Sequence, residues 1–402
     1  MPCPKPSLAR TLLSSLVLAA NLVGLVSASI SPALFRDLER HSRIVDITYC
    51  IGNSGIRKPF ECISRCNDFP ELSLVTTWST GLLLTDSCGY IAVDHGRNKA
   101  AKRPGENEDE NAKAKADENK RQLGAIVVAF RGTYSIRNTI VDLSTLPQQY
   151  VPYPPPDDGG QEPAGKPENR CDNCTVHMGF LQSWQSARDI VLPELKALRA
   201  KHPSYPIHLV GHSLGGAVAC LAGLEIKTSL GWDDIKVTTF GEPRVGNHEL
   251  ARFIDTVFAL DDDAELESRS FRRVTHSRDP VPLLPWGEWG YRSHAGEIYI
   301  SKPDLSPTEV DMTPCIGDND PACITDGQSF LHQVMSRWLH FGKPGTNLLE
   351  YLETMMFPMR IKPWQLFFAH RDYFWRLGLC VPGGDPTNWG RSHFTDFEQG
   401  EL

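Results

Sequence analysis

The chain has 402 residues, of which 41% are hydrophobic and 22% are charged, and its formal net charge is −8. These proportions are ordinary for a globular protein, and the length allows one large core or two domains. No basic cluster along the chain is rich enough to indicate binding to nucleic acid, so we expect no nucleic-acid partner.

The first residues have the pattern of a secretory signal peptide. Lys5 and Arg10 precede an apolar run over residues 12–26, and small side chains follow up to Ala28. The apolar run is shorter than the about 20 residues that a transmembrane helix needs, which favours cleavage near Ala28 over a retained signal anchor. We therefore expect a signal peptide over residues 1–28 and a secreted, extracellular protein, with a vacuolar or other secretory compartment as the alternative.

The eleven cysteines fit an oxidising compartment. Three pairs are close enough in sequence for local disulfides: Cys62 and Cys66, Cys171 and Cys174, and Cys315 and Cys323. Cys50 and Cys380 lie near opposite ends of the chain and are candidates for a bond that joins these ends. Cys220 lies in a helix of small residues and is expected to be a buried free thiol, whereas Cys88 has no obvious partner. The cysteine spacing does not match that of a zinc finger, so we expect no metal.

Up to residue 130, the sequence predicts one helix and several strands. Residues 31–49 carry apolar side chains at helical spacing and predict an amphipathic helix. Strands are predicted over residues 72–78, 81–85, 90–93 and 125–130. The last of these is a continuous apolar run, typical of a central strand that is buried on both faces. Residues 97–121 are highly charged with both signs, and we expect a solvated inserted loop rather than a docking surface.

After residue 130, helices and strands alternate. A second inserted loop, dense in Pro, Gly and Asp, is expected over residues 147–173. A helical pattern follows from Val176 to Lys201, where Pro193 either kinks the helix or splits it. Further strands are predicted over residues 207–210, 235–240, 271–275 and 298–300. This order indicates an α/β fold with a central, mostly parallel sheet, in a single domain over residues 29–402 that contains the two inserted loops.

The most specific chemical signal lies in the stretch Ile207–Gly216, which reads IHLVGHSLGG. Its Gly-x-Ser-x-Gly spacing is that of a nucleophile elbow, in which a strand turns sharply into a helix with the serine at the apex. Gly211 and Gly215 are needed there because a Cβ at either position would collide with the neighbouring strand or helix. A glycine-rich turn with a buried serine is the alternative. The strand before Ser213 and the small-residue helix after it favour a catalytic serine.

A serine nucleophile needs a base, and the base needs a carboxylate that orients it. In elbow folds the acid and then the histidine follow the serine along the chain. Asp279 is the best candidate for the acid because it closely follows a strand, although aspartate before proline is also a frequent turn residue. The side chains of Asp233, Asp234 and Asp255 lie on polar stretches and are expected to be solvated. On chemistry alone, five downstream histidines are candidates for the base: His294, His332, His340, His370 and His393.

Five segments, in this order along the chain, resemble the fungal class 3 lipases: Phe130–Thr133, Gly211–Gly216, Phe240–Asn247, Asp279–Pro282 and His370–Phe374. The resemblance covers most of residues 44–380. It implies an α/β-hydrolase fold and a catalytic triad of Ser213, Asp279 and His370, which favours His370 over the other histidines. It also implies an oxyanion hole formed by the N–H and hydroxyl of Thr133 and by the backbone N–H of Leu214.

The resemblance further assigns a lid to the segment that begins at Ser135. The apolar positions of this lid, which recur on one helix face, are Ile136, Ile140, Val141 and Leu143. A short amphipathic helix of this kind closes a site in water and opens where its apolar face meets a lipid surface. An ordinary surface helix is the alternative. The segment departs from the family at Thr139, where many lids carry tryptophan.

Together these features predict a secreted serine hydrolase that cleaves the ester bonds of acylglycerols through an acyl-enzyme, that is, a triacylglycerol lipase. The alternatives are a feruloyl or other carboxylester esterase, a phospholipase on the same fold, and a catalytically inactive lipid-binding protein. This chemistry requires no cofactor and no metal. The expected partner is a lipid substrate at an oil–water or membrane interface, with no obligate protein partner.

Overall fold

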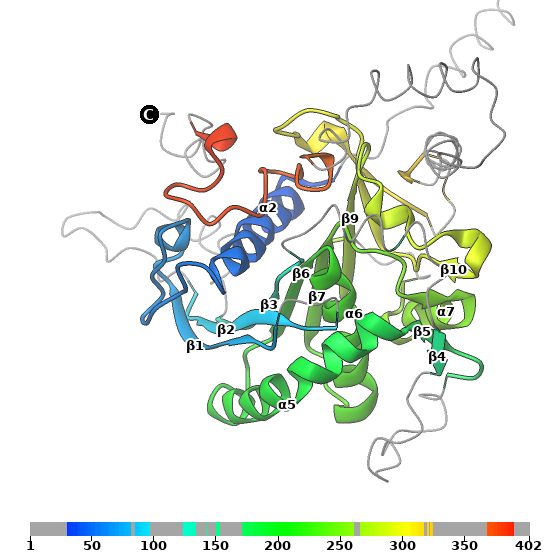
Figure 1. The fold of residues 1–402 in the computed structure, drawn as a ribbon, viewed down its shortest axis with the longest axis horizontal. Helices are drawn as coiled ribbons and strands as arrows, with labels where there is room; N and C mark the ends of the chain where they lie inside the picture. The colour runs from blue at the N-terminus through cyan, green and yellow to red at the C-terminus, as the bar shows by residue number, and fades with distance from the viewer. Residues whose placement is uncertain are drawn as a thin grey trace, which may run out of the picture.

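The computed structural model describes residues 30–81, 85–96, 124–133, 143, 150–152, 171–260, 266–316, 320, 322–324 and 368–389. Within these residues the chain forms a central sheet with helices on both faces (Figure 1). Helix α2, Pro32–Ile47, packs on one face, and helix α6, Leu214–Leu230, packs on the other. Helices α5, Met178–Lys201, and α7, His248–Phe258, both pack against α6.

The central sheet has eight strands in the order β1-β2-β3-β6-β7-β9-β11-β12. These strands are β1 Leu72–Ser79, β2 Cys88–Asp94, β3 Ala125–Phe130, β6 Ile207–His212, β7 Ile235–Phe240, β9 Phe271–His276, β11 Glu297–Ile300 and β12 Met312–Pro314. Strands β3, β6, β7, β9 and β11 run parallel, whereas β1, β2 and β12 pair antiparallel with their neighbours. Because the carboxyl ends of parallel strands meet at one edge of a sheet, the loops after β3, β6, β7 and β9 come together there.

A smaller sheet of four short strands has the order β10-β8-β5-β4. Its strands are β4 Tyr150–Pro152, β5 Thr175–His177, β8 Gly246–Asn247 and β10 Tyr291–Arg292. Single turns of 3₁₀ helix occur at η1 Thr48–Cys50, η2 Cys66–Asp68, η4 Val281–Leu283, η5 Gly287–Trp289, η6 Glu309–Asp311 and η8 Pro386–Asn388. Among the described residues, no helix combines the length and the apolar character that crossing a bilayer needs.

The central position of β3 explains its continuous apolar sequence. Ile126, Val128 and Phe130 face the hydrophobic cluster that includes α5 and α6. Val127 and Ala129 face the other cluster, which includes α2. The sheet thus separates two core layers, and alternate residues of one strand contribute to both. The predicted α/β fold with a central, mostly parallel sheet is confirmed.

The structure refines the sequence-based elements at three places. Gly81 and Thr85 lie outside any strand, because the pairing of β1 with β2 ends at Ser79 and Cys88, and residues 82–84 lie outside the described residues. Residues 150–152, expected in a loop, form β4. Pro193 does not split α5, which continues through it. The predicted signal peptide over residues 1–28, the charged insertion over 97–121 and most of the insertion over 147–173 lie outside the described residues.

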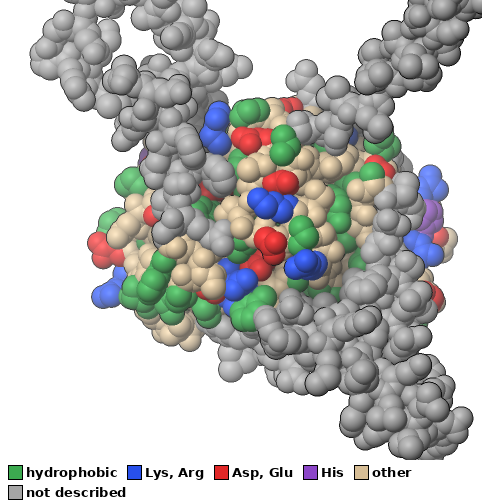
Figure 2. Space-filling model, turned by 90° about the horizontal axis from the view of Figure 1, so that it is seen from above, with side chains coloured by type: hydrophobic (Ala, Val, Ile, Leu, Met, Phe, Trp, Pro, Cys, Tyr) green, Lys and Arg blue, Asp and Glu red, His purple; other side chains and the backbone are tan. Residues whose placement is uncertain are grey.

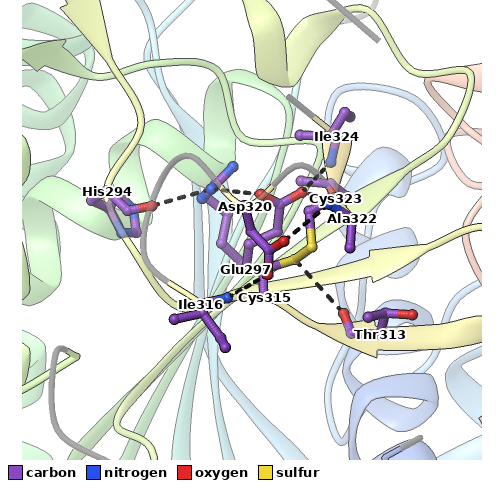
Figure 3. Close-up of a disulfide and its surroundings, with 11 residues drawn as sticks. His294, Glu297, Thr313, Cys315, Ile316, Asp320, Ala322, Cys323 and Ile324 are labelled. Atoms are coloured by element: carbon purple, nitrogen blue, oxygen red, sulfur yellow. Dashed lines mark hydrogen bonds and ion pairs between the residues drawn. A yellow bond between two sulfur atoms is a disulfide. The ribbon is translucent and has the colours of Figure 1, made fainter. Parts of the chain in front are cut away.

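All four predicted disulfides are present: Cys50–Cys380, Cys62–Cys66, Cys171–Cys174 and Cys315–Cys323. Cys88 and Cys220, which are both buried, are the free cysteines of the described residues. Figure 3 shows the Cys315–Cys323 disulfide beside Glu297 of β11. The Cys315 N–H donates to the Glu297 carbonyl over 3.0 Å, so this disulfide lies against the edge of the central sheet.

Candidate active site

Ser213 lies at the sharp turn between β6 and α6, with a φ of 58° and a ψ of −128°. A Cβ built on Gly211 would lie 2.1 Å from the carbonyl oxygen of Gly215. A Cβ on Gly215 would lie 2.3 Å from the carbonyl oxygen of Phe130. These close backbone approaches explain the glycine on each side of the serine. A positive φ at a residue with a side chain is strained, and such strain is concentrated at functional turns.

His370 and Asp279 form a buried pair. His370 Nδ1 lies 2.9 Å from both carboxylate oxygens of Asp279, although 91 positions separate the two residues. Neither side chain is exposed to solvent. An ionised carboxylate only accepts hydrogen bonds, so Nδ1 carries a proton and Nε2 of the neutral ring is left as an acceptor.

Two further groups hold the Asp279 carboxylate. Tyr373 Oη donates to Oδ2, and the N–H of Val281 donates to Oδ1 over 2.9 Å. Burial by itself raises the pKa of Asp279, but the interaction with His370 and the three hydrogen bonds outweigh burial and hold this pKa below its usual range. Asp279 is therefore ionised at neutral pH.

Ser213 Oγ and His370 Nε2 are both buried, and neither has a hydrogen-bond partner in the described part of the chain. The rings of His212 and His370 stack with their centroids 4.7 Å apart, which places His370 beside the residue that precedes Ser213. Buried polar atoms without partners are uncommon and call for an explanation such as a catalytic role. The structure therefore brings His370 and Asp279 into contact, while the hydrogen bond between Ser213 and His370 is not formed. Catalytic hydrogen bonds are often long or misaligned before substrate binds.

The two residues expected to form the oxyanion hole occupy different elements. Leu214 is the first residue of α6, where backbone N–H groups have no acceptor within the helix. Thr133 follows β3 and is partly exposed. Of the expected lid positions, Leu143 is fully buried in the cluster that includes α5 and α6. The other lid positions lie outside the described residues: Ser135, Ile136, Ile140 and Val141.

The similarity to known proteins agrees with this geometry. The sequence profile of the family described as Lipase (class 3) matches residues 127–288, which include Ser213 and Asp279. A protein of Gibberella zeae named secreted mono- and diacylglycerol lipase 2 is 62% identical over 365 residues, which are 91% of this chain and 86% of that protein. The chain belongs to the class 3 lipase family. This lipase is also 58% identical over 372 residues to Lipase A of Sodiomyces alcalophilus, with 90% of this chain and 86% of that protein covered.

Solved structures give the same result for the fold. The Lip2 lipase of Yarrowia lipolytica has a TM-score of 0.64 and 26% identity, covering 88% of this lipase and 97% of that chain. The expected α/β-hydrolase fold is confirmed by this likeness and by the strand order. The expected secretion is confirmed by the similarity to a relative named as a secreted lipase.

The remaining acid and base candidates are placed elsewhere or are not described. His294 Nε2 lies 3.0 Å from Glu242 Oε1 and takes no part in the Ser213 site. Asp255, expected to be solvated, is instead buried, and its carboxylate accepts the Ala295 N–H over 2.8 Å. The other histidine candidates lie outside the described residues: His332, His340 and His393.

Three buried residues of this lipase come close to a set of metal ligands: Cys220, Glu242 and His294, whose ligand atoms lie within 4.8 Å of one another. Their chemistry does not favour a metal. His294 and Glu242 are already hydrogen-bonded to each other, and burial raises the pKa of Cys220 well above its usual range. Binding of a metal at this thiol would require release of its proton. We interpret the cluster as a hydrogen-bonded polar pair beside a thiol.

Sequence reasoning missed the side chains that surround the His370–Asp279 pair. Tyr373 follows His370 by three positions, within a segment already singled out, so its role could have been suspected. The contacts of His212 could not have been predicted from the sequence. Its Nδ1 lies 2.5 Å from Tyr49 Oη, although 163 positions separate the two residues. No local pattern carries information about a contact of this range.

Proposed function

We propose that this lipase hydrolyses the ester bonds of acylglycerols, including mono- and diacylglycerols, through an acyl-enzyme on Ser213. The observation that carries the proposal is the buried His370–Asp279 pair beside the strained Ser213 turn. The substrate class is supported by the Gibberella zeae relative, which is named a mono- and diacylglycerol lipase. No described contact favours a phospholipid or feruloyl ester over an acylglycerol.

In the proposed reaction His370 is the general base. Its Nε2 accepts the Ser213 hydroxyl proton as Oγ attacks the ester carbonyl, and it returns this proton to the leaving glycerol oxygen. Asp279 holds the ring with Nδ1 protonated and stabilises the imidazolium that forms. Water then repeats the sequence of proton transfers and releases the fatty acid, which regenerates Ser213.

The oxyanion of each tetrahedral intermediate needs hydrogen-bond donors. We assign this role to the backbone N–H of Leu214 and to the N–H and hydroxyl of Thr133. The first N–H groups of α6 point out of the helix terminus beside Ser213, where the helix dipole also favours negative charge. Each such donor lowers the barrier by about 3 kcal/mol.

We also propose that residues 1–28 are a signal peptide and that residues 29–402 form one hydrolase domain. In this proposal the lid over residues 135–143 exposes its apolar face at an oil–water or membrane interface. On the face seen in Figure 2, basic and acidic side chains of the described residues lie close to each other, with apolar side chains between them. This face has no continuous basic surface of the kind that nucleic acid requires.

The test is hydrolysis of a panel of emulsified esters by purified protein beside its Ser213→Ala variant. We expect release of fatty acid from mono- and diacylglycerols, and a loss of at least about 1,000-fold in the variant. Triacylglycerols, phospholipid vesicles, feruloyl esters and short soluble esters complete the panel. Equal rates for the two proteins would overturn the catalytic assignment. A higher rate on phospholipid or feruloyl esters than on any acylglycerol would overturn the substrate class.

A further inference from the structure

Two buried side chains outside the proposed triad, Tyr49 and His212, lie between the base and the end of β3. Tyr49 Oη lies 2.5 Å from His212 Nδ1, and His212 Nε2 lies 2.8 Å from the carbonyl oxygen of His370. The backbone N–H of Gly132 also hydrogen-bonds the Tyr49 oxygen. Tyr49 is 1% exposed and His212 is 0% exposed, so no bulk water competes for these bonds.

The directions of the hydrogen bonds in this series follow from its two ends and from the charge of His212. A backbone N–H only donates, so the Gly132 N–H uses the Tyr49 oxygen as acceptor. A carbonyl only accepts, so His212 Nε2 must carry the proton that it donates to His370. Burial lowers the pKa of His212 to about 3, so the ring is neutral, and Nδ1 accepts the hydroxyl proton of Tyr49.

The series joins parts of the site that are far apart in sequence. Gly132 precedes the proposed oxyanion donor Thr133, His212 precedes the nucleophile Ser213, and the last acceptor belongs to the base itself. Space around Gly132 is tight, because a Cβ there would lie 2.6 Å from Tyr49 Oη and 2.8 Å from Ser213 Cβ. A shift of the Tyr49 hydroxyl would therefore move both Gly132, next to the proposed oxyanion donor Thr133, and His212, which holds the His370 base.

We propose that Tyr49 and His212 are positioning residues, whose hydrogen bonds set the distance between the proposed oxyanion hole, Ser213 and the His370 base. The proposal rests on the proposed serine-hydrolase function and deepens it. The stacked ring of His212 contacts the face of His370, while its Nε2–H holds the His370 backbone. One imidazole thus fixes both the backbone position and the ring plane of the base. Small misplacements of a catalytic group can cost up to about 100-fold in rate.

The first experiment removes one hydroxyl and compares it with a matched control. Tyr49→Phe leaves His212 Nδ1 and the Gly132 N–H without their partner. Tyr90→Phe removes another fully buried tyrosine hydroxyl, which donates to the Ile44 carbonyl over 2.8 Å on the α2 side of the sheet. On a short soluble ester we expect kcat to fall about tenfold in Tyr49→Phe with KM changed less than about twofold. In Tyr90→Phe we expect kcat to change less than about twofold.

The second experiment separates the two bonds of His212. Glutamine reaches as far as the imidazole Nε2 and can keep a donor to the His370 carbonyl, whereas leucine keeps neither bond. We expect His212→Gln to recover at least part of the kcat that His212→Leu loses. The same order is expected for the rate at which an active-site phosphonate labels Ser213, because labelling needs the base and the oxyanion donors but no turnover.

These measurements distinguish the positioning role from the proposed function. If the wild-type protein hydrolyses no ester and Ser213 is not labelled, the proposed function itself fails. If the wild type is active and folded Tyr49→Phe retains its kcat, the positioning role is overturned and the bonds are only structural. If Tyr49→Phe does not fold, the test uses ¹⁵N-histidine NMR of the wild type. A neutral His212 protonated at Nε2 from pH 5 to 8 supports the series, and a charged or Nδ1-protonated His212 overturns it.

Discussion

Cys50 and Cys380 are joined by a disulfide although 330 positions of sequence separate them. Cys50 directly follows Tyr49 at the end of the N-terminal helical segment, and Cys380 closes the segment that carries His370. A hydrogen bond beside the disulfide joins the same two segments, since the Gly378 N–H donates to Asp46 Oδ1 over 2.7 Å. The base of the proposed triad is therefore held by the N-terminal part of the fold and not only by the sheet.

Removal of this disulfide is expected to lower stability strongly. In the chain-entropy model, a bond that closes so long a loop contributes about 6 kcal/mol, whereas one that closes a loop as short as that of Cys62–Cys66 contributes about 2 kcal/mol. We expect Cys50→Ala/Cys380→Ala to lower the melting temperature by on the order of 10 °C. Cys62→Ala/Cys66→Ala is the matched control. Equal losses in the two double variants would contradict this prediction.

Tyr373 is expected to set the acid limb of the pH–rate profile. Its hydroxyl bond to Asp279 helps to keep the pKa of this carboxylate low. In Tyr373→Phe the carboxylate holds a proton more strongly, and it also stabilises the imidazolium of His370 more strongly. The coupled pair then titrates at a higher pH, so the acid limb of kcat/KM should move up by about one pH unit. The profile is measured on a soluble ester, with Tyr90→Phe as the control that should not move the limb.

The predictions that succeeded depend on patterns that are local in sequence. β3 was predictable because a strand buried on both faces must be apolar throughout, and the Ser213 turn was predictable because its glycines are required by close backbone contacts. The ends of the strand predicted over residues 81–85 lie outside any strand, since the end of the β1–β2 pairing is decided by tertiary contacts. Pro193 lies on the exposed side of α5, and the helix continues through it.

The choice of the catalytic base shows more clearly what the sequence alone cannot predict. Five histidines were chemically equivalent in the sequence, and only the resemblance to a family favoured His370. The contact that distinguishes it, with Asp279, spans 91 positions and depends on how the C-terminal segment returns to the sheet. The burial of Asp255, which accepts the Ala295 N–H, is likewise not revealed by helical periodicity.

Acid is expected to destabilise the interface between α2 and the sheet. His41 is 1% exposed, and its Nε2 lies 3.4 Å from His208 Nδ1. Burial lowers the pKa of His41 to about 4. In the unfolded chain histidine binds a proton below about pH 6.5, so the unfolded state gains protons first and the folded state loses stability as the pH falls from 6.5 towards 4. Above pH 6.5 both states are neutral and His41 contributes no pH dependence.

The check compares urea unfolding at pH 4.5 and pH 7.5. We expect the stability difference between these two pH values to be smaller by about 2 kcal/mol in His41→Gln than in the wild type. Other groups also titrate in this range, including Asp46, where burial raises the pKa to about 6 and favours the folded state in acid. The change on mutation isolates His41 from them. The solvent-exposed His248→Gln is the control, and an unchanged difference in His41→Gln would refute the prediction.

The Ser213 turn is expected to tolerate no Cβ at Gly215. That atom would lie 2.3 Å from the Phe130 carbonyl oxygen and 2.8 Å from the carbonyl carbon of Arg131, so only a separation of α6 from β3 could relieve the clash. We expect Gly215→Ala to lower the free energy of unfolding by about 3 kcal/mol. Because the shift moves the residue next to Leu214, phosphonate labelling of Ser213 per folded molecule should also slow.

Gly231 supplies the matched control for this substitution on the same helix. It ends α6 with a φ of +66°, and a Cβ built there meets nothing within 4 Å. Gly231→Ala therefore costs only the backbone strain of about 1 kcal/mol, and it should leave the labelling rate of Ser213 unchanged. The measurements are the denaturant midpoints of Gly215→Ala and Gly231→Ala and the rates at which a phosphonate labels Ser213 in each. If Gly215→Ala is as stable and as reactive as Gly231→Ala, the close packing of α6 against β3 does not constrain the serine turn.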